Sequence, residues 1–256
     1  MRVTLFIPCL VQDVMPEAGL ACLHVLRAAG VDPVVPKGQT CCGQPLYKLG
    51  HTDRVRPLAR RVIDLFSGCD AVVCPSGSCT HMIRRYPGLF PDDPATAARA
   101  RSLAARTYEF TEFLVDILHV TDFGAHLPTS AVYHDSCQMG RTLNLHAQPR
   151  LLLSRVAGLT LVEPETPDAC CGFGGPFSMR FPGVSEALTL DKIQAILDTR
   201  ATTVICAEPS CLLNIKGALA HNHTPLQTLH IAQVLATGPG GGEACGGATP
   251  TPPAGG

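Results

Sequence analysis

The chain has 256 residues, of which 46% are hydrophobic and 16% charged, and its formal net charge is −1. This length suits one large domain or two domains of about 120 residues. The balanced charge and the lack of a Lys/Arg-rich stretch argue against a nucleic-acid-binding protein. No apolar run approaches the roughly 18–20 residues that a membrane-spanning helix needs, so we expect no transmembrane segment.

Thirteen cysteines are the most informative part of the composition. The apolar run from Val3 to Val11 is too short for the core of a signal peptide, and Asp13 and Glu17 follow where a cleavage site would lie. We therefore expect a cytoplasmic protein. In a reducing compartment, so many cysteines indicate metal or redox chemistry rather than a disulfide framework.

In chain order, the first half alternates short β-rich segments with amphipathic segments. The pattern predicts strands over 2–8, 31–35 and 71–74, and helices over 16–29, 54–66 and 80–85. Such alternation predicts a parallel sheet with right-handed crossovers. Residues 86–128 are expected to connect the halves, with helix over most of the range from Ala95 to His119.

The same plan then repeats. Further strands are predicted over 131–133, 159–163 and 203–205. The cysteines of the two halves are separated by nearly constant offsets, which are 128 for Cys9/Cys137, 129 for Cys41/Cys170 and Cys42/Cys171, and 132 for Cys74/Cys206 and Cys79/Cys211. We infer an internal duplication. The expected fold is α/β, with two lobes that each contain a small parallel sheet with flanking helices and cysteine turns at its carboxyl edge.

The expected domains are a first lobe with its connecting helix over 1–128, a second lobe over 129–236 and a disordered tail over 237–256. Gly and Pro dominate the tail, and Cys245 within it is interpreted as incidental. Cys22 and Cys69 have no counterpart in the other half, so we interpret them as small core residues.

Each half offers an isolated Cys, a Cys-Cys-Gly turn and one further Cys. Adjacent cysteines do not easily bridge each other, but they suit a multinuclear metal centre, and the glycines allow a tight turn. Four thiolates match the ligation of a [4Fe–4S] cluster. Zinc also accepts four cysteines, although its structural sites usually take two cysteines separated by two to four residues, so zinc is the minority alternative. The candidate ligands are Cys9, Cys41, Cys42, Cys79, Cys137, Cys170, Cys171 and Cys211.

The motifs around these cysteines resemble a known family. They are Phe6-Ile7-Pro8-Cys9, Thr40-Cys41-Cys42-Gly43-Gln44-Pro45, Pro75-Ser76-Gly77-Ser78-Cys79, Tyr133-His134-Asp135-Ser136-Cys137, Cys170-Cys171-Gly172-Phe173-Gly174-Gly175 with Phe177-Ser178, and Pro209-Ser210-Cys211-Leu212. Together they resemble the cysteine-rich CCG-domain proteins, which include the B subunit of heterodisulfide reductase and the iron–sulfur subunits of glycolate and glycerol-3-phosphate oxidation systems. The nearest likeness is to the lactate utilization protein A family.

That resemblance implies a cytoplasmic iron–sulfur oxidoreductase subunit, with two [4Fe–4S] clusters as the expected cofactors. It would act with two other subunits, at least one of them an iron–sulfur protein, in the oxidation of L-lactate to pyruvate. The small 2-hydroxy acid would be the substrate of the complex as a whole. No Gly-x-Gly-x-x-Gly motif follows a strand, so the chain itself is expected to relay electrons rather than bind a dinucleotide.

The chain also departs from the heterodisulfide reductase pattern. Ser76 and Glu208 stand where that pattern has the first cysteine of each closing pair, which favours a four-ligand cluster over a five-thiolate one. Cys74 and Cys206 are possible additional or exchangeable thiols. Two alternative functions remain, namely a heterodisulfide or thiol reductase subunit and a zinc-bound structural subunit without a redox role.

Three polar residues near Cys137 have two interpretations each. His134 and Asp135 can tune a cluster by hydrogen bonding to sulfur, or His134 can simply pack while Asp135 caps the following helix. Arg141 can face cluster charge or a substrate carboxylate, or it can be a plain surface residue.

Overall fold

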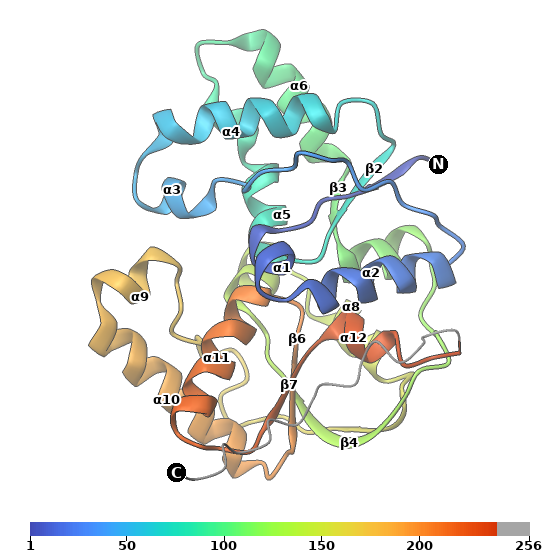
Figure 1. Cartoon of the computed structure of the whole chain (residues 1–256), viewed down its shortest axis with the longest axis vertical. Helices are drawn as coiled ribbons and strands as arrows, with labels where there is room; N and C mark the ends of the chain where they lie inside the picture. The colour runs from blue at the N-terminus through green and yellow to red at the C-terminus, as the bar shows by residue number, and fades with distance from the viewer. Residues whose placement is uncertain (240–256) are drawn as a thin grey trace, which may run out of the picture.

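The computed structural model describes residues 1–239 and contains two parallel sheets that lie in two lobes (Figure 1). The prediction for the tail over 237–256 therefore lies almost wholly outside the described residues, as does Cys245. In the first lobe, the sheet has the order β1-β2-β3, and in the second lobe it has the order β5-β4-β6-β7. Every strand pair is parallel. The predicted fold class is confirmed.

The elements of the first lobe are β1 (Val3–Leu5), α1 (Cys9–Asp13), α2 (Pro16–Ala28), α3 (Gln44–Lys48), α4 (Thr52–Leu65), β2 (Ala71–Cys74), α5 (Gly77–Arg84), η1 (Tyr86–Leu89), α6 (Pro94–Ala105), β3 (Thr107–Glu109), α7 (Phe110–Glu112) and η2 (Phe113–Ile117). Those of the second lobe are β4 (His126–Tyr133), η3 (Gln138–Thr142), α8 (Ala147–Leu153), β5 (Ala157–Leu161), α9 (Pro176–Arg180), α10 (Pro182–Asp198), β6 (Thr203–Cys206), α11 (Pro209–His221), β7 (Gln227–His230) and α12 (Ile231–Leu235).

The central strands of the two sheets show why these segments become strands. Every residue of β2 and of β6 is buried, which is the pattern of a parallel strand covered by helices on both faces. Each of these strands leads into a helix that begins with a capping side chain, Ser76 for α5 and Glu208 for α11. The strand ends and helix starts that carry the cysteines are thus built alike in the two lobes.

Three details of the predicted elements differ from the structure. The strand predicted over 31–35 is wrong, because only Val34 pairs with β1, through an isolated bridge to Thr4. Pro33 and Pro36 lack the N–H groups that a longer ladder would need. The helix predicted as far as His119 is also wrong in part, because Thr107–Glu109 forms β3 against β2. The short strand β7 was not predicted.

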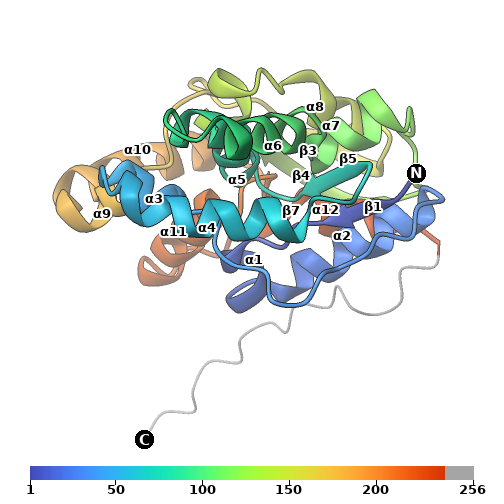
Figure 2. The same ribbon diagram turned by 90° about the horizontal axis from the view of Figure 1, so that it is seen from above.

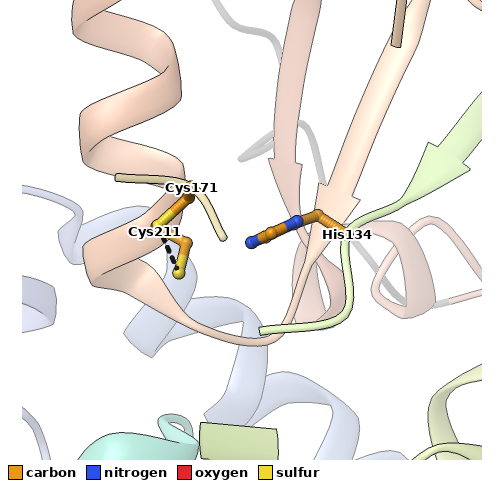
Figure 3. A group of neighbouring side chains, drawn as sticks. All are labelled: His134, Cys171 and Cys211. Carbon is orange, nitrogen blue, oxygen red and sulfur yellow. Dashed lines mark hydrogen bonds between the residues drawn. The ribbon is translucent and has the colours of Figure 1, made fainter. Parts of the chain in front are cut away.

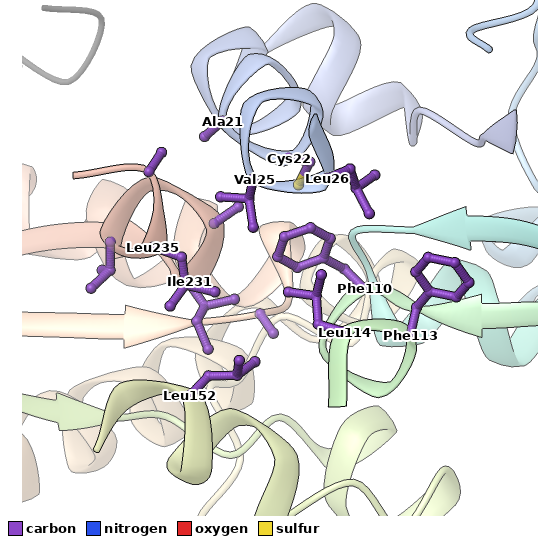
Figure 4. Close-up of a cluster of buried hydrophobic side chains, with 14 of the residues drawn as sticks. Ala21, Cys22, Val25, Leu26, Phe110, Phe113, Leu114, Leu152, Ile231 and Leu235 are labelled. Atoms are coloured by element: carbon purple, nitrogen blue, oxygen red, sulfur yellow. The ribbon is translucent and has the colours of Figure 1, made fainter. Parts of the chain in front are cut away.

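The two lobes share one hydrophobic core. It combines residues of both sheets with α2, α7, α8 and α12. Figure 4 shows Val25 and Leu26 of α2 near Phe110, with Ile231 and Leu235 of α12 beside them. Cys22 lies in this core and Cys69 in the core of the first lobe, as predicted. A shared, close-packed core holds the two cysteine-bearing edges in a fixed relation.

The arrangement of helices places comparable parts of the lobes at one end of the molecule. Figures 1 and 2 both show α3 of the first lobe at the same end as α9 and α10 of the second. Lys48 at the end of α3 donates a hydrogen bond from Nζ to the carbonyl of Gly174, which comes just before α9, at 3.4 Å. Among the described residues, no helix is both long and apolar enough to cross a membrane. The lobe boundary placed between residues 128 and 129 stays a prediction, and β4 begins at His126.

Candidate metal centres

The two Cys-Cys-Gly turns have the same backbone geometry. Gly43 and Gly172 have φ values of 87° and 85°, a conformation that residues with a Cβ rarely adopt. In this conformation, each glycine N–H donates to the first cysteine of its turn, Cys41 or Cys170, at 3.4 Å. The glycine thus serves two purposes, since it reverses the chain and supplies a donor to a thiol sulfur.

In each lobe, four thiols form an inner and an outer pair. The inner pairs are buried, with 3.3 Å between the Sγ atoms of Cys42 and Cys79 and 3.0 Å between those of Cys171 and Cys211. The outer pairs are partly exposed; they are Cys9 with Cys41, 3.9 Å apart, and Cys137 with Cys170. None of the twelve described cysteines forms a disulfide.

The first cysteine of each turn is poised as a thiolate. Hydrogen bonds from Cys42 and Cys9 lower the pKa of Cys41 to about 3. Hydrogen bonds from Cys137 and Cys171 likewise lower the pKa of Cys170 to about 2. The pKa of Cys9 is raised, above all by its interaction with Cys41. The pKa of Cys79 is also lowered, above all by a hydrogen bond from Cys42. Because a metal binds the thiolate form, each lobe presents an anionic donor next to its other cysteines.

Both sets of thiols line a single cavity of about 330 Å³ between the lobes. All eight predicted ligands contribute to its wall: Cys9, Cys41, Cys42, Cys79, Cys137, Cys170, Cys171 and Cys211. Apart from cysteines, Lys48 and Glu208 are the ionisable residues among the described residues of the wall. The sequence predicted one cysteine edge per lobe, and the structure brings these two edges together.

Cys74 and Cys206 lie outside this wall. Both side chains are fully buried, and their sulfurs point to the carbonyls of Ser76 and Glu208, at 3.6 and 3.7 Å. Each also interacts with the inner cysteine of its own lobe, Cys74 with Cys79 and Cys206 with Cys211. Because they do not line the cavity, their role as additional or exchangeable thiols stays a prediction.

Several residues that hold the turns were missed by sequence reasoning. The buried Tyr86 hydroxyl donates to the carbonyl of Cys42 at 2.9 Å. In the second lobe, Asn214 and Thr189 donate to the carbonyl of Cys171 at 2.8 and 3.0 Å. Asn214 lies three residues after Cys211, on the same helix face, which is the one signal that points to it.

Ser76 and Glu208, the residues in place of two cysteines, meet between the lobes. The Ser76 hydroxyl donates to both carboxylate oxygens of Glu208, at 3.2 and 3.1 Å. The backbone N–H of Ser78 donates to the same carboxylate at 2.7 Å. Burial raises the pKa of Glu208. These positions therefore serve as a polar junction between the thiol sets.

The three polar residues near Cys137 have different surroundings. His134 is 1% exposed and points toward Cys171 and Cys211 (Figure 3). Asp135 forms an ion pair with Arg150 at 2.6 Å. The helix-cap interpretation for Asp135 is wrong, because Ser136 accepts the N–H of Met139 instead. Arg141 is exposed, donates to the carbonyl of Asp168 and does not line the described cavity.

The donor set of each lobe fits a soft metal centre. Thiolates bind iron–sulfur clusters and zinc, whereas hard cations such as Mg²⁺ and Ca²⁺ require oxygen ligands. The free thiols of a pair lie next to each other, and no protein group separates the two sulfurs. The turn glycines also direct N–H donors to sulfur, and hydrogen bonds to sulfur are among the factors that set the potential of an iron–sulfur cluster.

Comparisons with known proteins agree with the duplication. A family model described as CCG, cysteine-rich domain, matches residues 3–84 and again residues 131–216. The lactate utilization protein A of an Exiguobacterium species is 44% identical over 93% of this chain and 98% of its own length. The protein of the same name from Bacillus pumilus is 44% identical over 92% of this chain and 99% of its own length.

A solved structure shows the same fold at much lower identity. The crystal structure of a hypothetical protein from Helicobacter pylori matches 97% of this chain with a TM-score of 0.65 and 9% identity. The chain spans about half of that protein, since the match covers 49% of it.

Proposed function

Because the chain belongs to the lactate utilization protein A family, with a cysteine-rich CCG domain in each half, we propose that it is an iron–sulfur electron-transfer subunit of a system that oxidises L-lactate to pyruvate. The name of its relatives supports the lactate assignment. The observation that carries the redox assignment is the cavity itself, since two equivalent sets of four thiols line its wall.

The proposed ligands are four cysteines per lobe. In the first lobe they are Cys9, Cys41, Cys42 and Cys79, and in the second lobe Cys137, Cys170, Cys171 and Cys211. A bound [4Fe–4S] cluster would supply reversible electron uptake in each lobe. The chain holds the thiolates, donates glycine N–H groups to sulfur, and buries the inner pairs away from water. Donors to sulfur and burial are the means by which a protein sets such a potential.

Lactate oxidation itself is assigned to partner subunits. Conversion of L-lactate to pyruvate releases two electrons and two protons, which need an acceptor. Among the described residues, no arginine lines the cavity, so no guanidinium is in place to bind the carboxylate of a 2-hydroxy acid in the bidentate manner. We therefore propose that two other subunits bind the substrate and the first acceptor, and that this chain carries the electrons onward. Free thiols of this kind favour action in the cytoplasm.

Metal analysis tests the proposal most directly. The protein, purified without oxygen, is expected to contain about eight iron and eight acid-labile sulfide per chain, as two four-iron clusters require. Zinc in stoichiometric amounts with little iron would overturn the redox assignment and leave the structural alternative.

Growth on L-lactate tests the substrate separately. Deletion of the gene is expected to abolish growth on L-lactate, and the wild-type gene should restore it. A variant with Cys42→Ser and Cys171→Ser should fail to restore growth, whereas Cys69→Ser, a core cysteine outside the cavity, should succeed. Normal growth of the deletion strain, in a host without a second copy, would contradict the lactate assignment.

A further inference from the structure

A basic side chain anchors the segment before each Cys-Cys-Gly turn. In the first lobe, Arg61 on α4 donates from Nε and Nη2 to the carbonyl of Gly38, at 3.1 and 2.9 Å. In the second lobe, Lys192 on α10 donates from Nζ to the carbonyls of Thr166 and Pro167, at 3.1 and 2.9 Å. Gly38 and Pro167 each lie three residues before the first cysteine of their turn. The two anchors therefore act at equivalent points of the duplicated fold.

The two anchors differ in burial. Arg61 is exposed, so water and salt screen its charge. The side chain of Lys192 is fully buried, and no other lysine or arginine among the described residues is buried. The buried residues of α4 are all apolar, whereas those of α10 include Lys192. The buried cation thus belongs to the second lobe.

Lys192 belongs to the face of α10 that packs against the thiols of the second lobe. Thr189, three residues earlier on that face, donates to the carbonyl of Cys171 at 3.0 Å. Ile193 packs in one hydrophobic cluster with Cys171 and Cys211. A charge buried at this position interacts with the thiolates through the protein interior, where the dielectric constant is low and salt screens little.

The surroundings of Lys192 support its charged form. Burial lowers the pKa of Lys192, and the negative charges of Asp135 and of nearby thiols oppose this effect. Two carbonyl oxygens accept hydrogen bonds from the ammonium group. A four-iron cluster held by four thiolates would add negative charge beside it. The bound centre and the buried ammonium group therefore stabilise each other.

Neighbouring charged groups do not remove this difference between the lobes. Asp135 is already paired with Arg150, at 2.6 Å. The carboxylate of Glu208 accepts from the N–H of Ser78 at 2.7 Å and from the hydroxyl of Ser210 at 2.9 Å. These two serines directly precede the inner cysteines of the two lobes. The carboxylate therefore acts on both centres, whereas the buried ammonium group acts mainly on the second.

We propose that the buried ammonium group of Lys192 raises the reduction potential of the second-lobe centre above that of the first. This inference rests on the proposed function, because it concerns the two centres assigned there. Reduction adds one negative charge to a centre, and a nearby buried cation stabilises that charge. One electron that enters the chain therefore resides mainly in the second lobe, with no bond or proton changed.

Redox titration followed by electron paramagnetic resonance tests the order of the two centres. When the wild-type protein takes up one electron per chain, its spectrum should match that of Cys42→Ser, which keeps the second-lobe centre. It should differ from the spectrum of Cys171→Ser, which keeps the first-lobe centre. This measurement requires no change of Lys192, so it does not depend on the folding of a lysine variant. A one-electron signal from the first lobe would overturn the inference.

Variants of the two anchors separate the effect of charge from that of anchoring. Lys192→Met should shift the second-lobe potential downward and leave the first unchanged, whereas Lys192→Arg, which keeps the charge, should retain the wild-type order. Arg61→Met is the matched control, because it removes the equivalent anchor but only an exposed charge, and it should change neither potential.

The outcomes distinguish this inference from the proposed function. If Lys192→Met contains both clusters and keeps the wild-type potentials, this inference alone is overturned. Equal downward shifts in Lys192→Met and Arg61→Met, each in its own lobe, would also overturn it, because anchoring would then explain both. Stoichiometric zinc with little iron in the wild-type protein would overturn the proposed function, and this inference with it.

Discussion

The hydroxyl of Ser76 donates to the carboxylate of Glu208 across the boundary between the lobes, at 3.2 and 3.1 Å to the two oxygens. The two residues occupy equivalent positions, 132 residues apart, each two residues after the cysteine that ends a central strand. The equivalent positions of the two halves thus carry complementary groups, a hydroxyl donor in one and a carboxylate acceptor in the other.

This junction predicts a stability effect. Glu208→Ala would leave the Ser78 N–H without its buried acceptor, while the Ser76 hydroxyl would keep the Ser78 hydroxyl, at 3.1 Å, as its partner. We expect the free energy of unfolding to fall by about 1–3 kcal/mol, the cost of unsatisfied buried donors. Denaturant unfolding measures it, and Glu186→Ala at an exposed site of α10 should change it by no more than about 0.5 kcal/mol. Equal effects of both substitutions would contradict the role of the junction.

The glycines of the two turns predict unequal sensitivity to alanine. A Cβ on Gly172 would lie 2.4 Å from the backbone oxygen of Ser185, whereas a Cβ on Gly43 would meet a side-chain methyl of Val55 at 2.8 Å. Gly30 has a similar φ of 79° but open space around it. We expect Gly30→Ala to cost about 1–2 kcal/mol from backbone strain alone. Gly43→Ala should cost more, and Gly172→Ala the most, by about 1–3 kcal/mol beyond the strain.

Thermal or denaturant unfolding of the three glycine variants gives this ranking. Metal content adds a second measurement, because Gly172→Ala should lose metal from the second lobe only. If Gly172→Ala were as stable as Gly30→Ala, α10 would be able to move away from the new Cβ without cost. That result would contradict the steric effect expected from the backbone oxygen of Ser185.

The thiol sets predict that the two centres are lost one at a time. Cys42→Ser removes an inner thiol of the first lobe and Cys171→Ser one of the second. Each variant should retain about four of about eight iron atoms, the content of one four-iron cluster. The sulfur of Cys69 hydrogen-bonds to the carbonyl of Phe66. The Cys69→Ser variant should therefore retain all of its iron atoms. Complete loss of iron from either inner variant would mean that one centre spans both lobes.

A buried carboxyl outside the cavity predicts a pH dependence. Glu109 is fully buried, and burial raises its pKa from 4.5 to about 8. Between these values the folded protein keeps a proton that the unfolded chain has released, so the free energy of unfolding falls as pH rises. The slope is at most about 1.4 kcal/mol per pH unit. Denaturant unfolding from pH 5 to 8 should show this slope in wild type and a smaller slope in Glu109→Gln, in which Glu208, whose pKa burial also raises, still contributes.

Glu186→Gln is the matched control for the pH series, because its carboxyl is exposed. It should leave the slope unchanged. Glu112, which pairs with Arg84 at 2.7 Å beside Glu109, stays in place in both variants. A wild-type slope that survives in Glu109→Gln would assign the pH dependence to another group.

Much of the fold could be predicted because it depends on local pattern. The helix over 16–29 and the strand over 71–74 follow from periodicity and flanking prolines, and both exist within one residue of the predicted bounds. The errors have non-local causes. β3 forms because Thr107–Glu109 meets the free edge of β2, and β7 because Gln227–His230 meets β6. Such pairings depend on a partner strand that local sequence does not reveal.

The sequence by itself determined the duplication, the membership of each thiol set and the glycine turns, since residue types and their spacing suffice to show them. Only the tertiary structure decided that both sets line one cavity, that Glu208 joins Ser76, and that His134 faces Cys171 and Cys211. The physical reason is the shared hydrophobic core, which orients one sheet against the other and so brings together side chains that are far apart in the chain.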